Sequence, residues 1–219
     1  MKHTPSMPHT AINSFNNVII TQQERLNFEA TLFSLSLRQT NPHFAEKLFV
    51  ATPEANGLWL QDPSLQSGPL YDLLTQQGVT FIYFENRKVG HAYPYDNKNR
   101  GPRGVSAWET FHIFDSDTLI TGNLAEVPFD FNRPSGSLRH EAIRPKVIVG
   151  GPDCQTIWKS LYDHFGLKFT TSLNPKHAMS NCRHYLYFNA GFFYYQYPKI
   201  FGQLFADMRL KSANAAPES

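Results

Sequence analysis

Short apolar runs alternate with polar segments through the first half of the chain. Three of these runs are rich in the β-branched and aromatic residues typical of strands: Val18–Ile20, Leu48–Val50 and Val79–Phe84. Between the first two, apolar residues recur at helical spacing: Leu26, Ala30, Phe33 and Leu37. We expect this helix to end at Asn41, because the residue before a proline is pushed out of the α region. A second helix is predicted around Pro69–Gln77, where the following Gly78 is a typical C-terminal cap.

The second half of the chain has a less regular pattern. Three stretches have strand composition: Phe111–Phe114, Val147–Val149 and Tyr185–Tyr195, the last interrupted by Asn189-Ala190-Gly191. Two helices are predicted: Cys154–Phe165, with Asp153 as its N-cap and Gly166 after its end, and Pro198–Leu210. The glycines and prolines between Gly90 and Gly104 argue against a long helix there.

Strands that alternate with helices in this way predict an α/β fold with a doubly wound, mostly parallel sheet flanked by helices. A chain of 219 residues fits a single such domain. We expect the domain to span residues 17–210, with a loose N-terminal tail over residues 1–16 and a loose C-terminal tail over residues 211–219. Ligands bind such sheets at the carboxyl ends of the strands, so the polar loop that begins at Thr21 is a candidate binding loop.

Composition narrows the class of protein. The 20 basic and 18 acidic residues nearly cancel and no dense basic run is present, so we expect no nucleic-acid partner. No apolar run approaches the roughly 18–20 residues that cross a bilayer, so no transmembrane segment is expected. The first ten residues lack the apolar centre of a signal peptide, and a cytoplasmic protein is the expectation. Cys154 and Cys182 form neither a disulfide framework nor a zinc motif.

Two carboxylates follow the strand Phe111–Phe114 directly, in the order Asp115, Ser116, Asp117. In an extended chain this spacing would place both carboxylates on one face, with Cα atoms roughly 6.6 Å apart. Two anions so close would each disfavour ionisation of the other, and a divalent cation removes that conflict. Mg²⁺ or Mn²⁺ commonly binds one or two carboxylates together with water and substrate phosphates. The alternative, in which Asp115 caps the following turn and Asp117 is simply solvated, stays open.

Phosphatases of the haloacid dehalogenase type also have an acidic pair after a strand, in the order Asp-x-Asp-Gly-Thr. In this sequence Thr118 follows Asp117 directly and the glycine is missing. Those enzymes also need a later pair of adjacent acidic residues, and this sequence contains no two adjacent acidic residues. The phosphatase interpretation therefore fails.

A second family matches better. The segment Phe114–Leu124 resembles that of GT-A-type nucleotide-sugar glycosyltransferases, in which a hydrophobic residue and Asp-x-Asp-Thr precede a short apolar run and Gly-x-Leu. Tyr187–Phe193 is similar to the aromatic-Asn-x-Gly block of that family, and Asn97-Lys98 is similar to the Asn-Lys that often precedes its acidic pair. The resemblance covers about residues 17–210 and is nearest to family eight, with its galactosyltransferase- and glycogenin-like members.

The resemblance implies a single-domain GT-A-like, Rossmann-like fold that transfers a sugar from a nucleotide-diphosphate sugar. UDP is the favoured nucleotide, and a carbohydrate or glycan is the implied acceptor. Asp115 and Asp117 would hold Mn²⁺ or Mg²⁺ against the donor diphosphate. The implied donor- or substrate-binding residues are Thr21, Asn97, Lys98, Ser116, Asn189 and Gly191. No catalytic base is identified.

The sequence also departs from the family pattern. Glycogenin-like members have a third metal ligand, a histidine, near the C-terminus, and no histidine follows His184 here. His112 is a possible substitute, although a half-buried strand histidine that hydrogen-bonds a neighbour is the simpler interpretation. The 28 residues after Gly191 are few for the family, so a C-terminally short member is expected.

A chain with these departures is compatible with other functions. A non-catalytic GT-A-fold protein that binds nucleotide sugars is the alternative function. A nucleotidyltransferase is disfavoured, because Thr21-Gln22-Gln23 lacks the glycines of a phosphate-binding loop.

Overall fold

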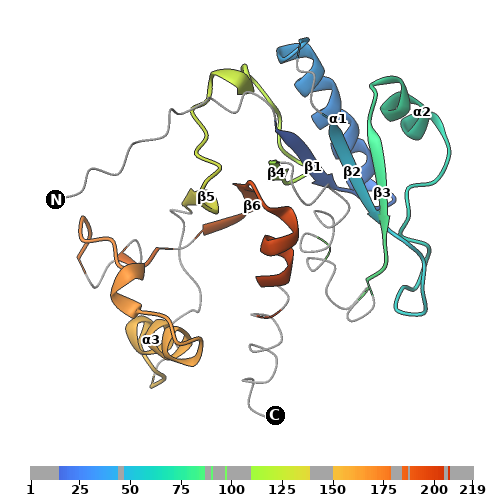
Figure 1. The fold of residues 1–219 in the computed structure, drawn as a ribbon. Helices are drawn as coiled ribbons and strands as arrows, with labels where there is room; N and C mark the ends of the chain where they lie inside the picture. The colour runs from blue at the N-terminus through green and yellow to red at the C-terminus, as the bar shows by residue number, and fades with distance from the viewer. Residues whose placement is uncertain are drawn as a thin grey trace.

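The computed structural model describes residues 15–43, 47–86, 90, 97, 110–138, 150–178, 184–186, 188–204 and 207 of the 219-residue chain. A six-stranded sheet in the order β3-β2-β1-β4-β6-β5 forms its centre (Figure 1). The strands are β1 (Asn16–Ile20), β2 (Leu48–Pro53), β3 (Thr80–Phe84), β4 (Phe111–Phe114), β5 (Ser135–Leu138) and β6 (Phe188–Tyr195). The helices include α1 (Arg25–Thr40), α2 (Pro69–Gln76) and α3 (Cys154–His164), with short 3-10 helices η4 (Leu124–Glu126) and η5 (Phe169–Ser172).

The sheet is mixed but mostly parallel. β3, β2, β1 and β4 run parallel to one another, whereas β6 is antiparallel to β4 and β5 is antiparallel to β6. The chain crosses from β1 to β2 through α1 and from β2 to β3 through α2, as parallel neighbours require. The predicted fold class, an α/β fold with a mostly parallel, Rossmann-like sheet flanked by helices, is confirmed.

Helix α1 covers one face of the sheet, as its apolar spacing predicts (Figure 1). Ala30, Phe33 and Leu37 are fully buried in a cluster that includes Ile19 of β1. The helix ends at the predicted place, where the Asn41 N–H donates to the Leu37 carbonyl at 2.9 Å. The buried stripe therefore fixes the position of α1, and with it the position of the side chains at its N-terminal end.

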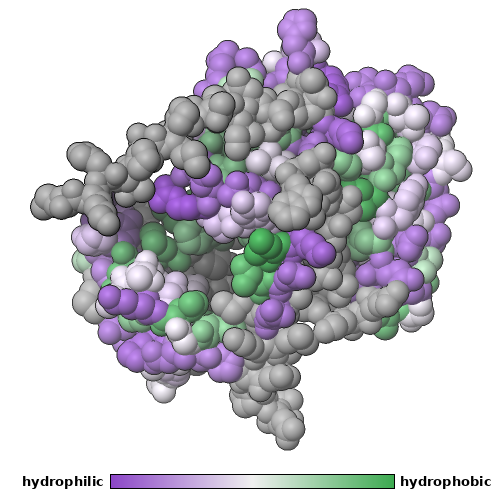
Figure 2. Space-filling view, viewed as in Figure 1, coloured by the Kyte–Doolittle hydropathy of each residue, from purple (hydrophilic) through white to green (hydrophobic). Residues whose placement is uncertain are grey.

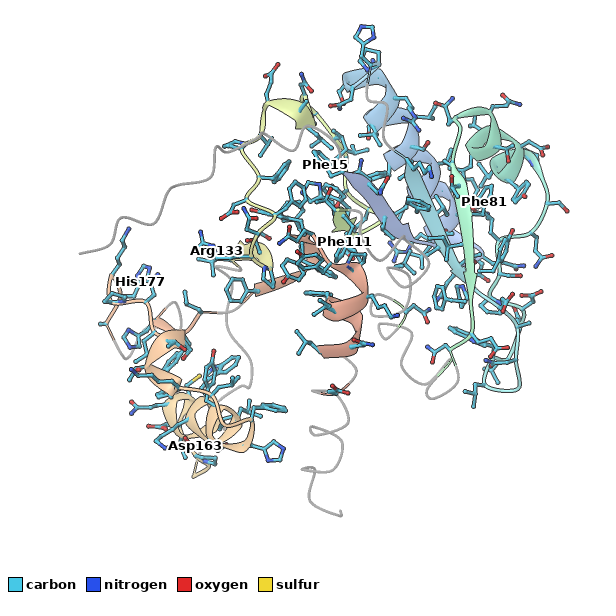
Figure 3. The ribbon with its side chains drawn as sticks, in the orientation of Figure 1. Phe15, Phe81, Phe111, Arg133, Asp163 and His177 are labelled. Atoms are coloured by element: carbon cyan, nitrogen blue, oxygen red, sulfur yellow. The ribbon has the colours of Figure 1, made fainter. Side chains whose placement is uncertain are left out.

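The other face of the sheet has a second apolar cluster. Because successive strand residues point to opposite faces, Val18 and Ile20 pack there with Ile113, away from Ile19. Phe111 belongs to this cluster and Phe15 to the α1 face, and both lie among the side chains crowded around β1 and β4 in Figure 3. Burial on both faces explains why Val18–Ile20 of β1 is an unbroken apolar run in the sequence.

Asn41 also anchors the segment that follows β4. Its Nδ2 donates to the Gly122 carbonyl at 3.1 Å, and its Oδ1 accepts from the Leu124 N–H at 2.7 Å. One turn earlier on α1, the Ser36 Oγ accepts from the Ile120 N–H at 3.0 Å. The acidic pair is thus held between a rigid strand and a segment fastened to α1.

The antiparallel edge of the sheet differs from the prediction. β6 runs unbroken from Phe188 to Tyr195, so the predicted interruption at residues 189–191 is wrong. β6 pairs with β4 over Phe192–Tyr195 and with Leu138 of β5 at Phe188, on either side of residues 189–191. The irregularity lies in the register between β6 and β5, which shifts between Gly136 and Leu138. β5 is absent from the sequence-based prediction because Ser-Gly-Ser-Leu has no apolar strand pattern.

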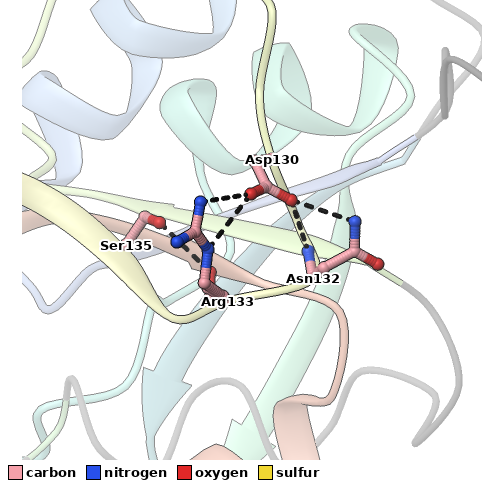
Figure 4. A network of polar contacts seen from close by, with 4 residues as sticks. All are labelled: Asp130, Asn132, Arg133 and Ser135. Carbon is pink, nitrogen blue, oxygen red and sulfur yellow. Dashed lines mark hydrogen bonds and ion pairs between the residues drawn. The ribbon is translucent and has the colours of Figure 1, made fainter. Parts of the chain in front are cut away.

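A loop between η4 and β5 brings two phenylalanines onto the core. Its outward-facing Asp130 carboxylate accepts hydrogen bonds from the Arg133 guanidinium and from the backbone and side-chain N–H groups of Asn132 (Figure 4). The Arg133 side chain lowers the pKa of that carboxyl. Phe129 and Phe131, on either side of Asp130, pack against the core cluster behind β4.

The predicted N-cap of helix α3 is confirmed. The Asp153 carboxylate accepts from the Thr156 N–H at 2.7 Å, and the positive φ of Gly166 follows the helix end. α3 and η5 form a lobe beside the sheet (Figure 1), and Asp163 and His177 both lie in this lobe, far from the labelled core residues (Figure 3).

The predicted strand Val147–Val149 and the segment between Gly90 and Asn97 lie outside the described residues, as does most of the predicted last helix beyond Leu204. Residues 198–204 are helical, as predicted. Among the described helices, none is long and apolar enough to cross a membrane. Hydrophilic residues cover much of the described surface in Figure 2, and apolar residues gather there in smaller patches.

Candidate donor and metal site

A pocket of about 400 Å³ lies beyond the carboxyl ends of β1 and β4. The chain leaves β1 toward β2 on one side and returns to β4 on the other, so the strand order reverses between β1 and β4. This switch point is where open α/β sheets bind ligands. The first segment of the lining is the end of β1 and the start of α1: Ile20, Gln22, Arg25, Leu26 and Glu29. The rest comes from the end of β4 and from an isolated position: Phe114, Asp115, Ser116, Asp117 and Asn97.

The acidic pair forms a turn. The Asp115 N–H donates to the Gly191 carbonyl of β6 at 2.7 Å, and the Thr118 N–H donates back to the Asp115 carbonyl at 3.1 Å. The expectation that the pair lies in extended chain is therefore wrong, because strand pairing stops at Phe114 and a backbone bond closes the next four residues into a β-turn. Both Asp115 and Asp117 nevertheless line the pocket. We call residues 115–118 the acidic turn.

Ser116, between the two aspartates, is buried and is bonded to α1. Its Oγ donates to the Glu29 Oε2 at 3.0 Å. The other oxygen of that carboxylate, Oε1, pairs with the Arg25 guanidinium one helical turn earlier. The acidic turn and the N-terminal end of α1 thus line the same pocket and are connected by a side-chain hydrogen bond.

Asn97 contributes an amide to the pocket. It is 1% exposed, and its Oδ1 accepts from the Asn86 Nδ2 at 2.8 Å, while the Asn86 carbonyl accepts from the Asn56 Nδ2 at 3.0 Å. No described residue accepts a hydrogen bond from the Asn97 Nδ2. A buried donor without a partner costs about 1–3 kcal/mol, so an oxygen of a bound ligand fits this position.

The remaining predicted site residues differ in their placement. Thr21 is fully buried, its Oγ1 donates to the Gln22 carbonyl at 3.3 Å, and it does not line the pocket, whereas Gln22 does. Gly191 meets the acidic turn through its backbone carbonyl. Lys98 and the side chain of Asn189 lie outside the described part of the structure.

His112 lies apart from the pocket. Its ring is fully buried among aromatic side chains, and burial lowers its pKa to about 3. Neither ring nitrogen has a hydrogen-bond partner among the described residues, so the expectation of a half-buried histidine satisfied by a neighbour is wrong. Aromatic rings pack around the imidazole, and the buried Asn17, its register partner on β1, makes no hydrogen bond to it.

The charges of the lining suit a divalent cation. The carboxylates of Glu29, Asp115 and Asp117 and the guanidinium of Arg25 give the described residues of the lining a formal net charge of −2. Among the described residues, no group of three His, Cys, Asp or Glu side chains has the arrangement of a complete protein metal site. Mg²⁺ and related ions typically bind one or two carboxylates and fill their remaining coordination positions with water and phosphate oxygens.

Gln22 lies in the loop after the first strand that the sequence predicts as a binding loop, and it lines the pocket. Glu29 and Leu26 were overlooked as lining residues. The available signal was their place in the chain: they follow the first strand of a doubly wound sheet, within the first turns of the next helix.

Comparison with known proteins adds one match. Residues 17–219 match the family model described as the Rhodobacterales glycosyltransferase domain. No significant match to a curated protein was found.

Proposed function

Because the chain belongs to the family of the Rhodobacterales glycosyltransferase domain, we propose that its pocket binds a nucleotide-diphosphate sugar together with Mn²⁺ or Mg²⁺. Family membership supports a glycosyltransferase, an enzyme that moves a sugar from a donor to an acceptor. The observation that carries the proposal for the donor and the metal is the acidic turn, which brings Asp115 and Asp117 to the lining of a pocket at the switch point of the sheet.

Asp115 and Asp117 are the residues that would hold the metal ion. A divalent ion bound there would offset the negative charge of a departing diphosphate. The backbone of the acidic turn is held by the Gly191 carbonyl, so the two carboxylates are supported by β6 as well as by β4. Such support matters because preorganised charges lose little energy to rearrangement during the reaction.

Other lining residues would bind and orient the donor. The buried Asn97 Nδ2 would donate to a donor oxygen, and the largely exposed Arg25 side chain would attract the anionic diphosphate toward the pocket. Lys98 and Asn189 stay predicted donor contacts on the resemblance alone. The preference for UDP also rests on that resemblance, and the acceptor is proposed to be a carbohydrate or glycan.

The test is a titration of the purified chain with UDP, GDP and their sugars, with and without Mn²⁺, by isothermal calorimetry. Asp117→Asn removes one proposed metal ligand. The matched control is Asp163→Asn, which removes an exposed carboxylate from α3, far from the core (Figure 3). We expect donor binding that depends on Mn²⁺, that weakens at least tenfold in Asp117→Asn, and that is unchanged in Asp163→Asn.

Release of sugar from the donor, followed with and without candidate glycan acceptors, completes the test. Slow hydrolysis or transfer that disappears in Asp117→Asn supports the enzyme. Metal-dependent binding without turnover under any acceptor supports the alternative, a non-catalytic nucleotide-sugar-binding protein. Donor binding that is equally strong with and without Mn²⁺, and equally strong in Asp117→Asn, would refute the metal site.

A further inference from the structure

Among the described residues of the pocket lining, Glu29 is the one carboxylate outside the acidic turn, and both of its oxygens have partners. Its side chain is 15% exposed, on the second turn of α1. Oε1 pairs with the Arg25 guanidinium, and Oε2 accepts the hydroxyl proton of Ser116. Hydrogen bonds to an ionised carboxylate are roughly twice as strong as those between neutral groups. Glu29 therefore binds the acidic turn to a helix that lies 87 residues away in sequence.

The acidic turn has backbone restraints at its two ends and this side-chain restraint at its middle. The Asp115 N–H is held by β6, and the Thr118 N–H closes the turn. Ser116 lies between the two aspartates, so the orientation of its side chain and the orientations of both carboxylates follow from the same backbone dihedrals. Holding the Ser116 hydroxyl against α1 thus limits the rotation of the whole turn.

We infer that Glu29 is a positioning residue that acts through Ser116 to keep Asp115 and Asp117 facing the pocket. The inference rests on the proposed metal site and adds the group that orients its ligands. Partners that orient metal ligands in this way change metal affinity about 10–100-fold when they are removed. The Arg25 guanidinium offsets the charge of Glu29, so that a third carboxylate can lie beside the acidic pair with less repulsion.

Four variants separate positioning from metal ligation and from general loss of structure. Ser116→Ala and Glu29→Ala each remove the hydrogen bond, and the double variant removes both partners. Glu29→Gln keeps an oxygen that accepts from Ser116 but loses the charge. Glu54→Ala, an exposed carboxylate after β2, is the control. Mn²⁺ affinity in the presence of UDP is measured by calorimetry for each.

We expect Ser116→Ala and Glu29→Ala each to weaken Mn²⁺ binding about 10–100-fold. The double variant should lose no more than Glu29→Ala, because the Ser116–Glu29 hydrogen bond is already absent in that single variant. Glu29→Gln should stay within about threefold of the wild type, and Glu54→Ala should match it. Additive losses in the double variant, or a Glu29→Gln variant as weak as Glu29→Ala, would overturn the inference.

Hydrogen–deuterium exchange of the metal-free protein distinguishes this inference from the proposed function. Loss of the Ser116–Glu29 bond should speed exchange of the Asp115 and Thr118 amides at least tenfold, with Glu29→Gln protected as in the wild type. Faster exchange in a protein that binds no metal would refute the proposed function and leave the positioning role standing. Unchanged exchange and unchanged Mn²⁺ affinity in Ser116→Ala would refute the positioning role and leave the metal site standing.

Discussion

Acid should unfold this protein through one histidine in its core. His112 lies within β4, and its ring contacts aromatic rings whose centroids are 4.1–5.8 Å away: those of Phe15, Phe114, Phe129, Phe131, Phe192 and Tyr194. No described residue accepts a hydrogen bond from either ring nitrogen, so a proton added there would bring an unpaired charge into the core. Burial accordingly lowers the pKa of His112 to about 3, from 6.5.

The sign and size of the effect follow from that difference in pKa. Between pH 6.5 and pH 3 the unfolded chain binds a proton on this histidine that the folded chain does not bind, so acid favours unfolding. The free energy of unfolding should fall by about 1.4 kcal/mol for each pH unit below 6.5, which is about 2 kcal/mol at pH 5. By pH 3 the loss is on the order of 4–5 kcal/mol, a large part of the roughly 5–15 kcal/mol that holds a typical domain folded. Above pH 7 the histidine adds no pH dependence.

Urea unfolding at pH 7, 6, 5.5 and 5 measures this contribution as a difference between the wild type and variants without the imidazole. His112→Phe and His112→Leu are both needed, because the larger ring can overpack the core. His43→Gln, in the exposed turn after α1, is the control for loss of an imidazole. We expect the gap between the wild type and each His112 variant to change by about 2 kcal/mol from pH 7 to pH 5, in favour of the variants. Parallel curves would show that His112 gains its proton without cost, and the reasoning from its burial would be refuted.

Two further predictions concern α1 and its contacts. Phe33→Ala should lower the free energy of unfolding by about 3–5 kcal/mol, because Phe33 is fully buried between α1 and the sheet. Phe28→Ala, on the exposed face of α1, should change it by less than about 0.5 kcal/mol. Urea unfolding at pH 7 compares the two variants, and equal losses would contradict the packing of α1. Asn41→Ala should lower the free energy of unfolding by about 2–4 kcal/mol, because it leaves the buried Leu124 N–H without its acceptor. Hydrogen–deuterium exchange of the Leu124 amide should also be faster in this variant, and a loss of stability without faster exchange would contradict the mechanism.

Elements whose signal is local could be predicted from the sequence. β1 and α1 follow from one apolar run and one helical stripe, and α3 follows from its Asp153 cap and the glycine after its end. β5 could not be predicted, because its Ser-Gly-Ser-Leu backbone is extended only by pairing with β6, more than fifty residues later. The continuous course of β6 also involves pairing with segments distant in sequence: with β4 over Phe192–Tyr195 and with Leu138 of β5 at Phe188.

The candidate site divides in the same way. Asp115, Asp117 and Asn97 could be proposed from sequence, because each belongs to a short motif with a fixed chemical meaning, and all three line the pocket. The turn that presents the aspartates could not, because it depends on a bond to β6 that no spacing rule describes. Glu29 depends on still more of the fold, since its carboxylate reaches Ser116 only after α1 has packed onto the sheet.

His112 and Asp115 show how one strand and the turn that follows it produce opposite environments for a polar side chain. Only two residues lie between His112 and Asp115 in the chain, yet the ring of His112 is buried among aromatic side chains and the side chain of Asp115 lines an open pocket. The difference arises at Phe114, where the sheet ends: before it, neighbouring strands and the loop at Phe129 close over β4, and after it the chain turns out of the sheet toward the start of α1. A polar residue on either side of that boundary has a different physical role. We therefore expect substitutions before Phe114 to act on stability and substitutions just after it to act on binding.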